Sequence, residues 1–494
     1  MTTAPKPDLV IRNASIIDGS GAPARSGDIA IAGDRVSAIG ALAHLSGAAE
    51  LDVGGRAVAP GFIDVHTHDD RAVLSDPDMT CKVSQGVTTV VTGNCGISLA
   101  PLKPAAAPPP PSDLIGDRPE HYFADFGAYL SALDRDPPAV NVVAQVGHST
   151  LRIGAMDGLD RAATPSEIAR MRGRLEDALA AGAVGMSTGL FYPPANAAPT
   201  EEVVELAAAL APAGAIHSTH MRDETAHVLE SLDETFEIGR KAHVPVVISH
   251  HKCAGTPNHG RTLESLPKID AARETQPIAL DVYPYVAGST VLNPHRMMSA
   301  SRVIVTWSKS VPEAAGRDLS EIAAAWGCTE TTAAERLQPA GAIYFIMDEE
   351  DVRRVLSYPH AMIGSDGLPH DQHPHPRLWG TFPRVLGHYA RDVGLFPLEE
   401  AVRRMTGLSA AQFGLTDRGV LRAGAYADLV VFDPRTVADC STWEEPARPA
   451  SGIELVMVNG RAVWQAGAGT GARPGRALRL QELGPKGRDR EAPV

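Results

Sequence analysis

The sequence predicts an α/β fold, namely a (β/α)8 TIM barrel that carries a small β-sandwich domain. Eight apolar runs alternate with stretches of helical period between residues 58 and 366, which is typical of repeated strand–helix units. Several runs are continuous apolar strings, such as residues 244–248, and parallel strands covered on both faces have this pattern. Short strand-and-turn patterns occupy both ends of the chain. A doubly wound open sheet is the alternative, but no GxGxxG motif follows a first strand to support it.

The barrel is expected over residues 58–415. Thr164 and Glu167 form a capping box around Pro165, which starts a helix that runs to Ala181. Thr200 starts the next helix, which ends near Gly214. The predicted strands are residues 58–66, 88–94, 140–147, 183–189, 214–220, 244–250, 277–283 and 361–366.

Two insertions interrupt this pattern. Residues 101–112 are rich in proline and predict a stiff polyproline II loop. Residues 284–360, after the seventh strand, are far longer than an ordinary connection and show helical patterns at 318–336 and 348–357. Barrel loops of this size lie over the carboxyl-terminal mouth, so we expect a lid or a pocket wall.

The two ends of the chain are expected to pair. Residues 1–57 and 416–480 are assigned to the β-sandwich domain, because neither half can bury its own apolar face alone. Turn residues at 32–34 and at Asn459-Gly460 predict hairpins. The chain from Gly467 is rich in glycine and arginine and is expected to be loosely ordered, with residues 481–494 as the tail.

The composition limits the possible functions. A net charge of −14 over 494 residues argues against a nucleic-acid partner, which needs a basic face. Five cysteines, an odd number, fit a reducing compartment without a disulfide framework. No apolar run approaches the roughly 20 residues that span a bilayer, and the first residues lack a signal-peptide core. We expect a cytoplasmic protein that acts on a small molecule, with no membrane partner; the oligomeric state stays open.

Residues of metal-ligand type follow the predicted strands. In an extended strand, His66 and His68 point to the same side and can share one ion. Each remaining residue has an ordinary structural explanation, since a buried cysteine, for example, is usually a small hydrophobe. A barrel would bring all the strand ends to one volume. The sequence therefore predicts a metal site built from His66, His68, Cys95, His220, His250 and Asp366.

Longer motifs carry a resemblance to a known family. Residues 61–68 (Gly-Phe-Ile-Asp-Val-His-Thr-His), with His220, His250 and Asp366, resemble the amidohydrolase superfamily. Four blocks are similar to the more specific N-acyl-D-amino-acid deacylases, the D-aminoacylase family, and the likeness covers most of the chain. The blocks are residues 92–96 (Thr-Gly-Asn-Cys-Gly), 218–222 (Ser-Thr-His-Met-Arg), 248–253 (Ile-Ser-His-His-Lys-Cys) and 364–367 (Gly-Ser-Asp-Gly).

The resemblance implies two metal positions. One would be held by His66, His68 and Asp366, and a tighter one by Cys95, His220 and His250, with Cys95 able to bridge. The fourth strand run lacks the lysine that bridges two metals in many relatives, which argues against a lysine-bridged hydantoinase or dihydroorotase. Mixed thiolate and imidazole ligands favour Zn2+, and we expect one tight zinc with a possible weaker second site.

The implied reaction is hydrolysis of an N-acyl-D-amino acid to a carboxylic acid and the free D-amino acid. Zinc would activate a water molecule, and Asp366 would take its proton and pass it to the leaving amine. Arg377 could pair with the substrate carboxylate, while Tyr283 and Tyr192 are further candidate donors. The resemblance implies a side-chain pocket without lysine or arginine, which predicts apolar D-amino acids over acidic ones. Its residues would be Phe191, Met298, Tyr344 and Met347.

Three alternatives stay open at this point. One is another amidohydrolase that opens cyclic amides, and a second is a deaminase of the same superfamily, in which a cysteine after the second strand is not expected. The third is a non-catalytic metal-binding scaffold, against which the presence of Asp366 argues. The preference for the D configuration rests on the resemblance alone.

Overall fold

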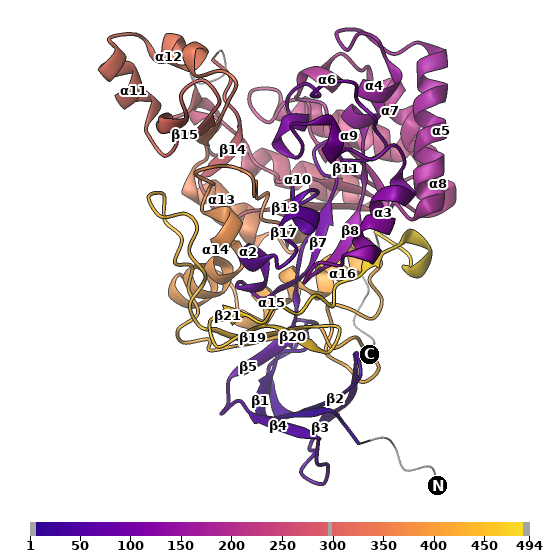
Figure 1. Cartoon of the computed structure of the whole chain (residues 1–494), viewed down its shortest axis with the longest axis vertical. Coiled ribbons are helices and arrows are strands. Elements are labelled where there is room, and N and C mark those ends of the chain that lie inside the picture. Colours follow the sequence, from indigo (N-terminus) through magenta and orange to yellow (C-terminus); the bar gives the residue numbers. More distant parts are fainter. Residues whose placement is uncertain (1–5, 295–298, 488–494) are drawn as a thin grey trace.

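The computed structural model describes residues 6–294 and 299–487, so Met298 lies outside the described residues. The fold is α/β. Figure 1 shows a central body of parallel strands surrounded by helices, a second sheet below it, and an arm that carries α11 and α12 at the upper left. Two parallel sheets make up the body: one has the order β22-β8-β7-β6 and the other β17-β13-β12-β11-β10-β9.

The strands of the body correspond to the eight predicted runs. The third run forms two strands, β8 and β9, that Gln145 separates. Only the second half of the first run belongs to the body, because the strand is interrupted at Gly61. A side chain at this position would lie 2.3 Å from the Thr88 hydroxyl, so only glycine fits there. The strands are β6 (Phe62–Asp64), β7 (Val87–Thr92), β8 (Asn141–Ala144), β9 (Val146–Gly147), β10 (Gly185–Gly189), β11 (Ile216–His220), β12 (Val246–Ile248), β13 (Ile278–Val282) and β17 (Ala361–Ile363).

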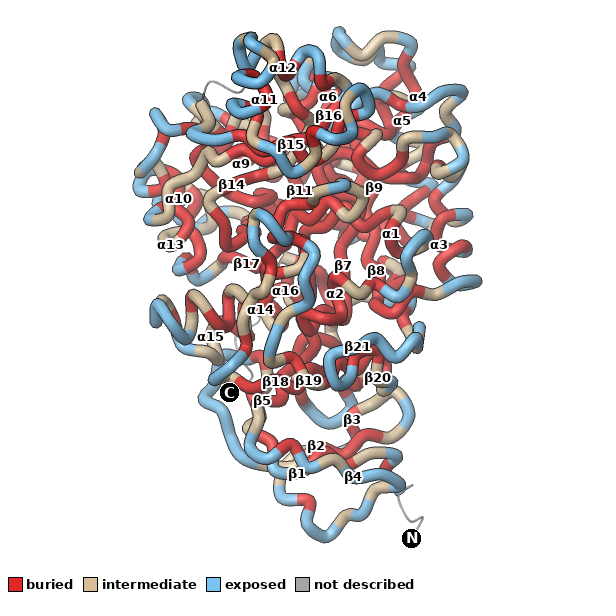
Figure 2. The backbone as a smooth tube through the Cα atoms, turned by 60° about the vertical axis from the view of Figure 1, so that its left-hand side comes forward, coloured by how far each residue is buried: buried red, intermediate tan, exposed pale blue. Residues whose placement is uncertain are grey.

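The two parallel sheets meet beside the first and last of these strands. A parallel bridge joins Thr67, just after β6, to Gly367, just after β17. The Asp366 amide also donates to the His66 carbonyl over 2.7 Å. One apolar residue from each run lies in a single buried cluster between the strands: Ile63, Val91, Val143, Val184, Ile216, Val247, Ala279 and Met362. Figure 2 shows that burial is concentrated in these strands, while the outer turns are exposed.

Helices follow the strands along the chain. The predicted capping box at Thr164 is present and starts α5. The helix expected from Thr200 to Gly214 is instead two helices, α7 and α8, with Gly214 in the left-handed conformation at the end. The helices are α1 (Ala72–Ser75), α2 (Thr80–Val83), α3 (Phe126–Arg135), α4 (His148–Ala155), α5 (Pro165–Ala181), α6 (Pro193–Asn196), α7 (Thr200–Ala207), α8 (Leu210–Ala213), α9 (Val228–Ala242), α10 (Thr262–Arg273), α13 (Glu349–Ser357), α14 (Arg377–Arg384), α15 (Leu398–Met405) and α16 (Gly407–Phe413).

The insertion after β13 contains a sheet that the sequence analysis did not predict. Three antiparallel strands in the order β14-β16-β15 pack against α11 and α12. Glycine and small residues such as Ala287, Gly288 and Gly341 weaken the strand pattern of β14 and β16, whereas the β-branched and aromatic residues of β15 are typical of a strand and were overlooked. The elements are β14 (Ala287–Val291), β15 (Val303–Ser308), α11 (Leu319–Trp326), α12 (Glu330–Leu337) and β16 (Ala340–Phe345).

Both ends of the chain contribute to one nine-stranded sheet, here called the terminal sheet. Its order is β21-β20-β19-β18-β5-β1-β2-β3, with β4 beside β1. The hairpins predicted at residues 32–34 and at Asn459-Gly460 join β2 to β3 and β19 to β20. The strands are β1 (Leu9–Ile16), β2 (Arg25–Ala32), β3 (Arg35–Gly40), β4 (Ala49–Asp52), β5 (Ala57–Pro60), β18 (Leu429–Phe432), β19 (Ile453–Val458), β20 (Arg461–Gln465) and β21 (Ala468–Gly469).

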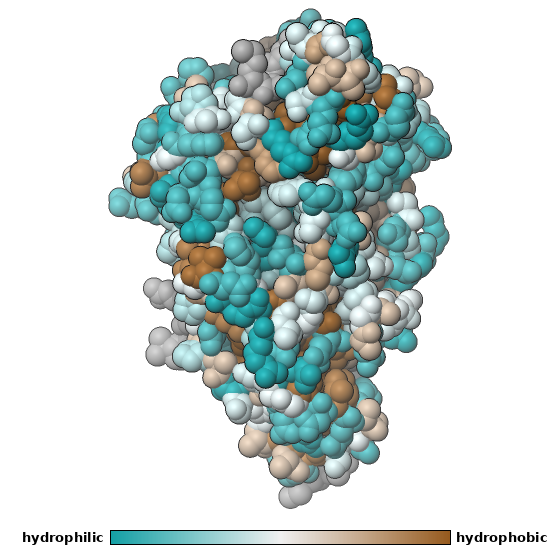
Figure 3. All heavy atoms as spheres, turned by 90° about the vertical axis from the view of Figure 1, so that its left-hand side faces the viewer, coloured by the Kyte–Doolittle hydropathy of each residue, from teal (hydrophilic) through white to brown (hydrophobic). Residues whose placement is uncertain are grey.

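The chain after Gly467 differs from the expectation of loose order. Strand β22 (Ala477–Leu478) pairs in parallel with β8, and Leu480 is buried beside it. That expectation is wrong for residues 477–482, because a few apolar residues within the glycine-rich stretch suffice to anchor it. None of the described helices is long and apolar enough to cross a membrane. The face shown in Figure 3 is mainly hydrophilic, with apolar residues in small separate groups.

Candidate functional site

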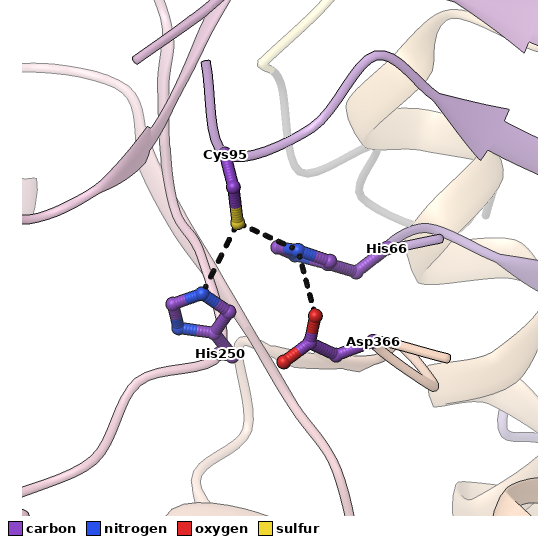
Figure 4. Close-up of side chains that lie close together, drawn as sticks. All are labelled: His66, Cys95, His250 and Asp366. Carbon is purple, nitrogen blue, oxygen red and sulfur yellow. Dashed lines mark hydrogen bonds and ion pairs between the residues drawn. The ribbon is translucent and has the colours of Figure 1, made fainter. Parts of the chain in front are cut away.

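Four side chains of metal-ligand type point toward one another beyond the carboxyl ends of four strands (Figure 4). They are His66 after β6, Cys95 after β7, His250 after β12 and Asp366 after β17, and one ligand atom from each lies within 4.8 Å of all the others. The Cys95 sulfur lies 3.3 Å from Nε2 of His66 and 3.3 Å from Nε2 of His250. Asp366 Oδ1 lies 3.5 Å from Nε2 of His66.

Two further predicted histidines adjoin this cluster. His68 places Nε2 3.2 Å from Asp366 Oδ1. The His220 ring centre lies 4.5 Å from that of His250. All six residues predicted as metal ligands therefore lie at or beside this one cluster in the folded chain.

Glu224 is a member of the site that the sequence analysis missed. Its carboxylate forms a second ligand-type group with His220 and His250. Oε1 lies 3.0 Å from Nδ1 of His250, and the Lys252 ammonium donates to the same oxygen over 2.8 Å. Glu224 lies in a loop, four residues beyond the end of β11. In a loop the sequence has no helix or strand period from which the direction of a side chain could be predicted. An acidic residue shortly after a ligand histidine was the only available signal.

Three of the candidate ligands have a strained backbone. Cys95, His250 and Asp366 have φ values of 52°, 38° and 50°, in the left-handed region that residues other than glycine rarely adopt. Such conformations collect at functional sites, where the surrounding structure holds them in place. Each follows a strand end by two or three residues, so the positive φ turns the chain sharply and aims the side chain back over the strands.

The glycine that follows Cys95 is explained by close packing. Gly96 has a φ of 79°, and a side chain there would lie 2.6 Å from the backbone nitrogen of Gly189. The Gly96 amide donates to the Ser187 hydroxyl over 2.9 Å. The Thr-Gly-Asn-Cys-Gly block is thus a turn that seats Cys95 against the fourth strand run.

The charges within the cluster shift its proton equilibria strongly. Burial by itself would raise the pKa of Cys95, but the adjacent His66 and His250 outweigh it and lower the pKa well below its usual value. Burial likewise opposes ionisation of Asp366, yet Arg377 and His66 hold the pKa of that carboxyl well below its usual range. The site therefore favours a thiolate and a carboxylate, the forms that bind metal ions.

Several buried polar atoms at this site lack a hydrogen-bond partner among the described residues. They include both ring nitrogens of His220 and Nδ1 of His68. Buried polar groups are normally paired, so the unpaired nitrogens of His220, of which Nε2 lies 3.6 Å from Glu224 Oε2, fit a site for a cation. A donor set of imidazole nitrogen, one sulfur and carboxylate oxygen suits zinc.

An arginine and a tyrosine border the cluster. Arg377 Nη1 lies 2.8 Å from Asp366 Oδ2, and the guanidinium carbon lies 4.6 Å from the ring centre of Tyr283. Arg377 Nε and the Tyr283 hydroxyl are both buried without a hydrogen-bond partner among the described residues. Such a pair of free donors can bind a carboxylate.

The other predicted pocket residues divide into two groups. Phe191 and Tyr192 lie against His220, with ring centres 5.3 and 5.0 Å away, and Met347 lines a small cavity with His250 and Tyr283. Tyr344 instead lies in the core of the insertion, where its hydroxyl donates to the Val291 carbonyl over 3.0 Å.

The chain is similar in sequence to proteins of a known family. The sequence profile of the amidohydrolase family matches residues 49–279 and 309–464. The chain belongs to the amidohydrolase family. Within the family it is 58% identical to a D-aminoacylase of Alcaligenes xylosoxydans xylosoxydans over 95% of this chain and 97% of that protein. It is 53% identical to an N-acyl-D-aspartate deacylase of the same organism over 95% of each chain.

Solved structures of this family include one with a similar fold and a bound inhibitor. The N-acyl-D-glutamate deacylase of Bordetella bronchiseptica, complexed with zinc and a phosphonate that mimics the tetrahedral intermediate, superposes with a TM-score of 0.93. The two chains are 48% identical, and the match covers 96% of this chain and 100% of the other. The resemblance inferred from the sequence motifs is thereby confirmed at the level of the family.

Proposed function

We propose that this amidohydrolase is a zinc-dependent N-acyl-D-amino-acid deacylase. The observation that carries the proposal is the convergence of His66, Cys95, His250 and Asp366 within 4.8 Å of one another. Relatives that share about half or more of the sequence are named for the deacylation of N-acyl-D-amino acids, which supports the same substrate class here.

The proposed ligands divide between two metal positions. Cys95, His220 and His250 would hold the tighter zinc, while His66, His68 and Asp366 would hold a weaker second ion. Cys95 could serve both positions, because its sulfur lies 3.3 Å from Nε2 of His66 and 3.3 Å from Nε2 of His250. Bound zinc supplies an electrophile for the scissile carbonyl and lowers the pKa of a water molecule.

Asp366 is the proposed general base and acid. Its Oδ1 faces His66 and His68 and its Oδ2 faces Arg377, so the carboxylate lies between the metal ligands and the anion-binding donors. In this position the Asp366 carboxylate can accept a proton from the attacking water and deliver it to the nitrogen of the leaving amine. Arg377 and Tyr283 bind the α-carboxylate of the substrate, and they thereby position the scissile amide beside Asp366.

The substrate side chain is proposed to be apolar. Phe191, Tyr192 and Met347 border the site, whereas Tyr344 lies in the core of the insertion and Met298 lies outside the described residues. Lys252 beside the site already donates to Glu224 over 2.8 Å, so its charge is neutralised and is not available to pair with an acidic substrate side chain. Kinetics on N-acetyl-D-methionine and N-acetyl-D-glutamate test this point, and faster turnover of the glutamate would contradict it.

The fine architecture is proposed as well. The two parallel sheets form one closed (β/α)8 barrel over residues 58–415, which the bridge between Thr67 and Gly367 and the shared cluster of one side chain per strand run support. The β-sandwich domain expected from residues 1–57 and 416–480 comprises the terminal sheet, whereas β22 pairs with β8 of the body. Residues 284–360 form a lid, and of the tail expected at 481–494, residues 488–494 lie outside the described residues. The few cysteines, none of them in a disulfide, support a cytoplasmic protein.

Metal analysis together with matched assays tests the proposed function. Purified protein should contain about one tightly held zinc and should hydrolyse N-acetyl-D-methionine but not the L form or a hydantoin. Hydantoin opening in place of deacylation would establish the cyclic-amide alternative. Zinc without any hydrolysis would favour the scaffold, and the absence of zinc would contradict the site.

A further inference from the structure

His375 is a buried histidine that neither the motifs nor the proposed chemistry includes. It lies two residues before Arg377, at the start of α14, and is 2% exposed. Each ring nitrogen has one backbone partner: Nε2 lies 2.9 Å from the Ala287 carbonyl, and the Arg377 amide donates to Nδ1 over 2.9 Å. A carbonyl can only accept, so Nε2 carries the hydrogen and Nδ1 does not. Burial and the charge of Arg377 also lower the pKa of His375 well below its usual value, which keeps the ring neutral.

These two bonds join the proposed carboxylate-binding arginine to the insertion. Ala287 is the first residue of β14. Two residues further along the same strand, the Ser289 carbonyl accepts from Arg377 Nη2 over 3.2 Å. Strand β14 therefore holds Arg377 at both ends, its backbone through His375 and its guanidinium directly. The other guanidinium nitrogen, Nη1, lies 2.8 Å from Asp366.

Two aromatic side chains, Tyr285 before β14 and Trp443, pack against the same ring. The His375 ring lies 5.1 Å from that of Tyr285 and 4.9 Å from that of Trp443, both nearly perpendicular to it. Trp443 belongs to the connection between β18 and β19, and it also packs 4.7 Å from Phe345 of β16. Trp443, in the connection between β18 and β19, thus contacts both His375 and the insertion.

We propose that His375 is a positioning residue that fixes Arg377 to strand β14, so that recognition of the substrate carboxylate depends on the base of the insertion and on Trp443. The inference rests on the proposed function, in which Arg377 binds that carboxylate. It deepens the proposal by naming which parts of the chain hold the arginine in place.

Two substitutions separate the two bonds of His375. In H375N, the shorter amide can still accept from the Arg377 amide, as asparagine does in an Asx turn, but it cannot reach Ala287. In H375Q, the longer amide can donate to Ala287 but no longer accepts from the Arg377 amide. Because the two bonds act in series between β14 and Arg377, loss of either one predicts that H375N and H375Q each raise KM about fivefold to tenfold, with kcat within about twofold of wild type.

The decisive measurement compares two substrates. The first is N-acetyl-D-methionine, and the second is its analogue without the carboxylate, N-acetyl-3-(methylthio)propylamine. Positioning of Arg377 predicts that H375N loses kcat/KM on the first substrate and keeps it on the second, with zinc content unchanged. H44N, at an exposed histidine of the terminal-sheet region, is the matched control and should behave as wild type.

W443L gives an independent measurement from the far side of the ring. It should raise KM in the same selective way, and the double variant with H375N should raise KM by less than the product of the two single effects. Unchanged KM in either single variant would overturn the inference, as would an equal loss on both substrates or a loss of zinc. A wild-type protein without activity on N-acyl-D-amino acids would instead overturn the proposed function, and this inference with it.

Discussion

Glu224 provides a test of how the metal ligands are oriented. Glu224 is 6% exposed and its Oε1 lies 3.0 Å from Nδ1 of His250, while Nε2 of the same ring faces Cys95. Carboxylates in this position fix the orientation of a metal-binding imidazole and increase its basicity. The substitution E224Q keeps the shape of the side chain but removes its charge, and it leaves the ammonium of Lys252 without its anionic partner.

The expected effect is a weaker zinc site. Loss of such a carboxylate typically lowers metal affinity about 10- to 100-fold, equivalent to about 1.4–2.7 kcal/mol. The unpaired charge of Lys252, also buried, adds to the loss because it now repels the cation. We expect the upper half of this range.

Competition with a chromophoric chelator measures the zinc affinity directly, without any reliance on turnover. The matched control is E234Q, because Glu234 also pairs with a basic side chain, Arg222, over 2.7 Å, but lies on α9 away from the ligand rings. A zinc affinity in E224Q within twofold of wild type would refute the role given to Glu224.

Three further predictions follow from the same geometry. D366N should lower kcat by about 10²- to 10⁴-fold in steady-state assays while zinc content is retained, because Cys95, His220 and His250 remain; near-normal turnover would exclude Asp366 as the base. K82M should lower the free energy of unfolding by about 3–5 kcal/mol in urea titrations. The Lys82 ammonium lies 2.8 Å from Asp64 and 3.3 Å from Asp69, and its loss leaves both fully buried carboxyl groups without a cationic partner. A decrease of less than about 1 kcal/mol would contradict this. Burial raises the pKa of Asp371 to about 7, so its contribution to stability is present below the unfolded value of about 4 and is lost as the pH rises through 7; D371N should therefore gain stability relative to wild type at pH 8 but not at pH 4, as thermal unfolding at the two pH values would show.

The sequence predicts the parallel strands well because strands covered on both faces consist almost wholly of apolar residues. It places the ligands for the same reason, since a residue such as Cys95 or His250 is recognised by its distance from a strand end. The Pro60-Gly61 break is visible in the sequence, but the division of the first run between the terminal sheet and the body is not, because it depends on the pairing of β5 with β1 and with the distant β18.

Residues that act through distant partners escaped prediction. Glu224 and His375 lie in irregular segments, and their importance comes from contacts with Lys252, His250, Ala287 and Trp443 that only the folded chain creates. The sheet of the insertion was missed for a different reason: β14 and β16 contain small residues, and the strand-forming run Val303–Ser308 of β15 was overlooked among the helical patterns.

The terminal sheet has a consequence for synthesis of the chain. Strand β5 pairs with β1 on one side and with β18 on the other, and β18 emerges from the ribosome only after the whole catalytic region. Until then one edge of the early strands stays open, and an open apolar edge can pair with another nascent chain. Messages truncated before β18 should therefore yield aggregates, even when every residue of the metal cluster has been translated.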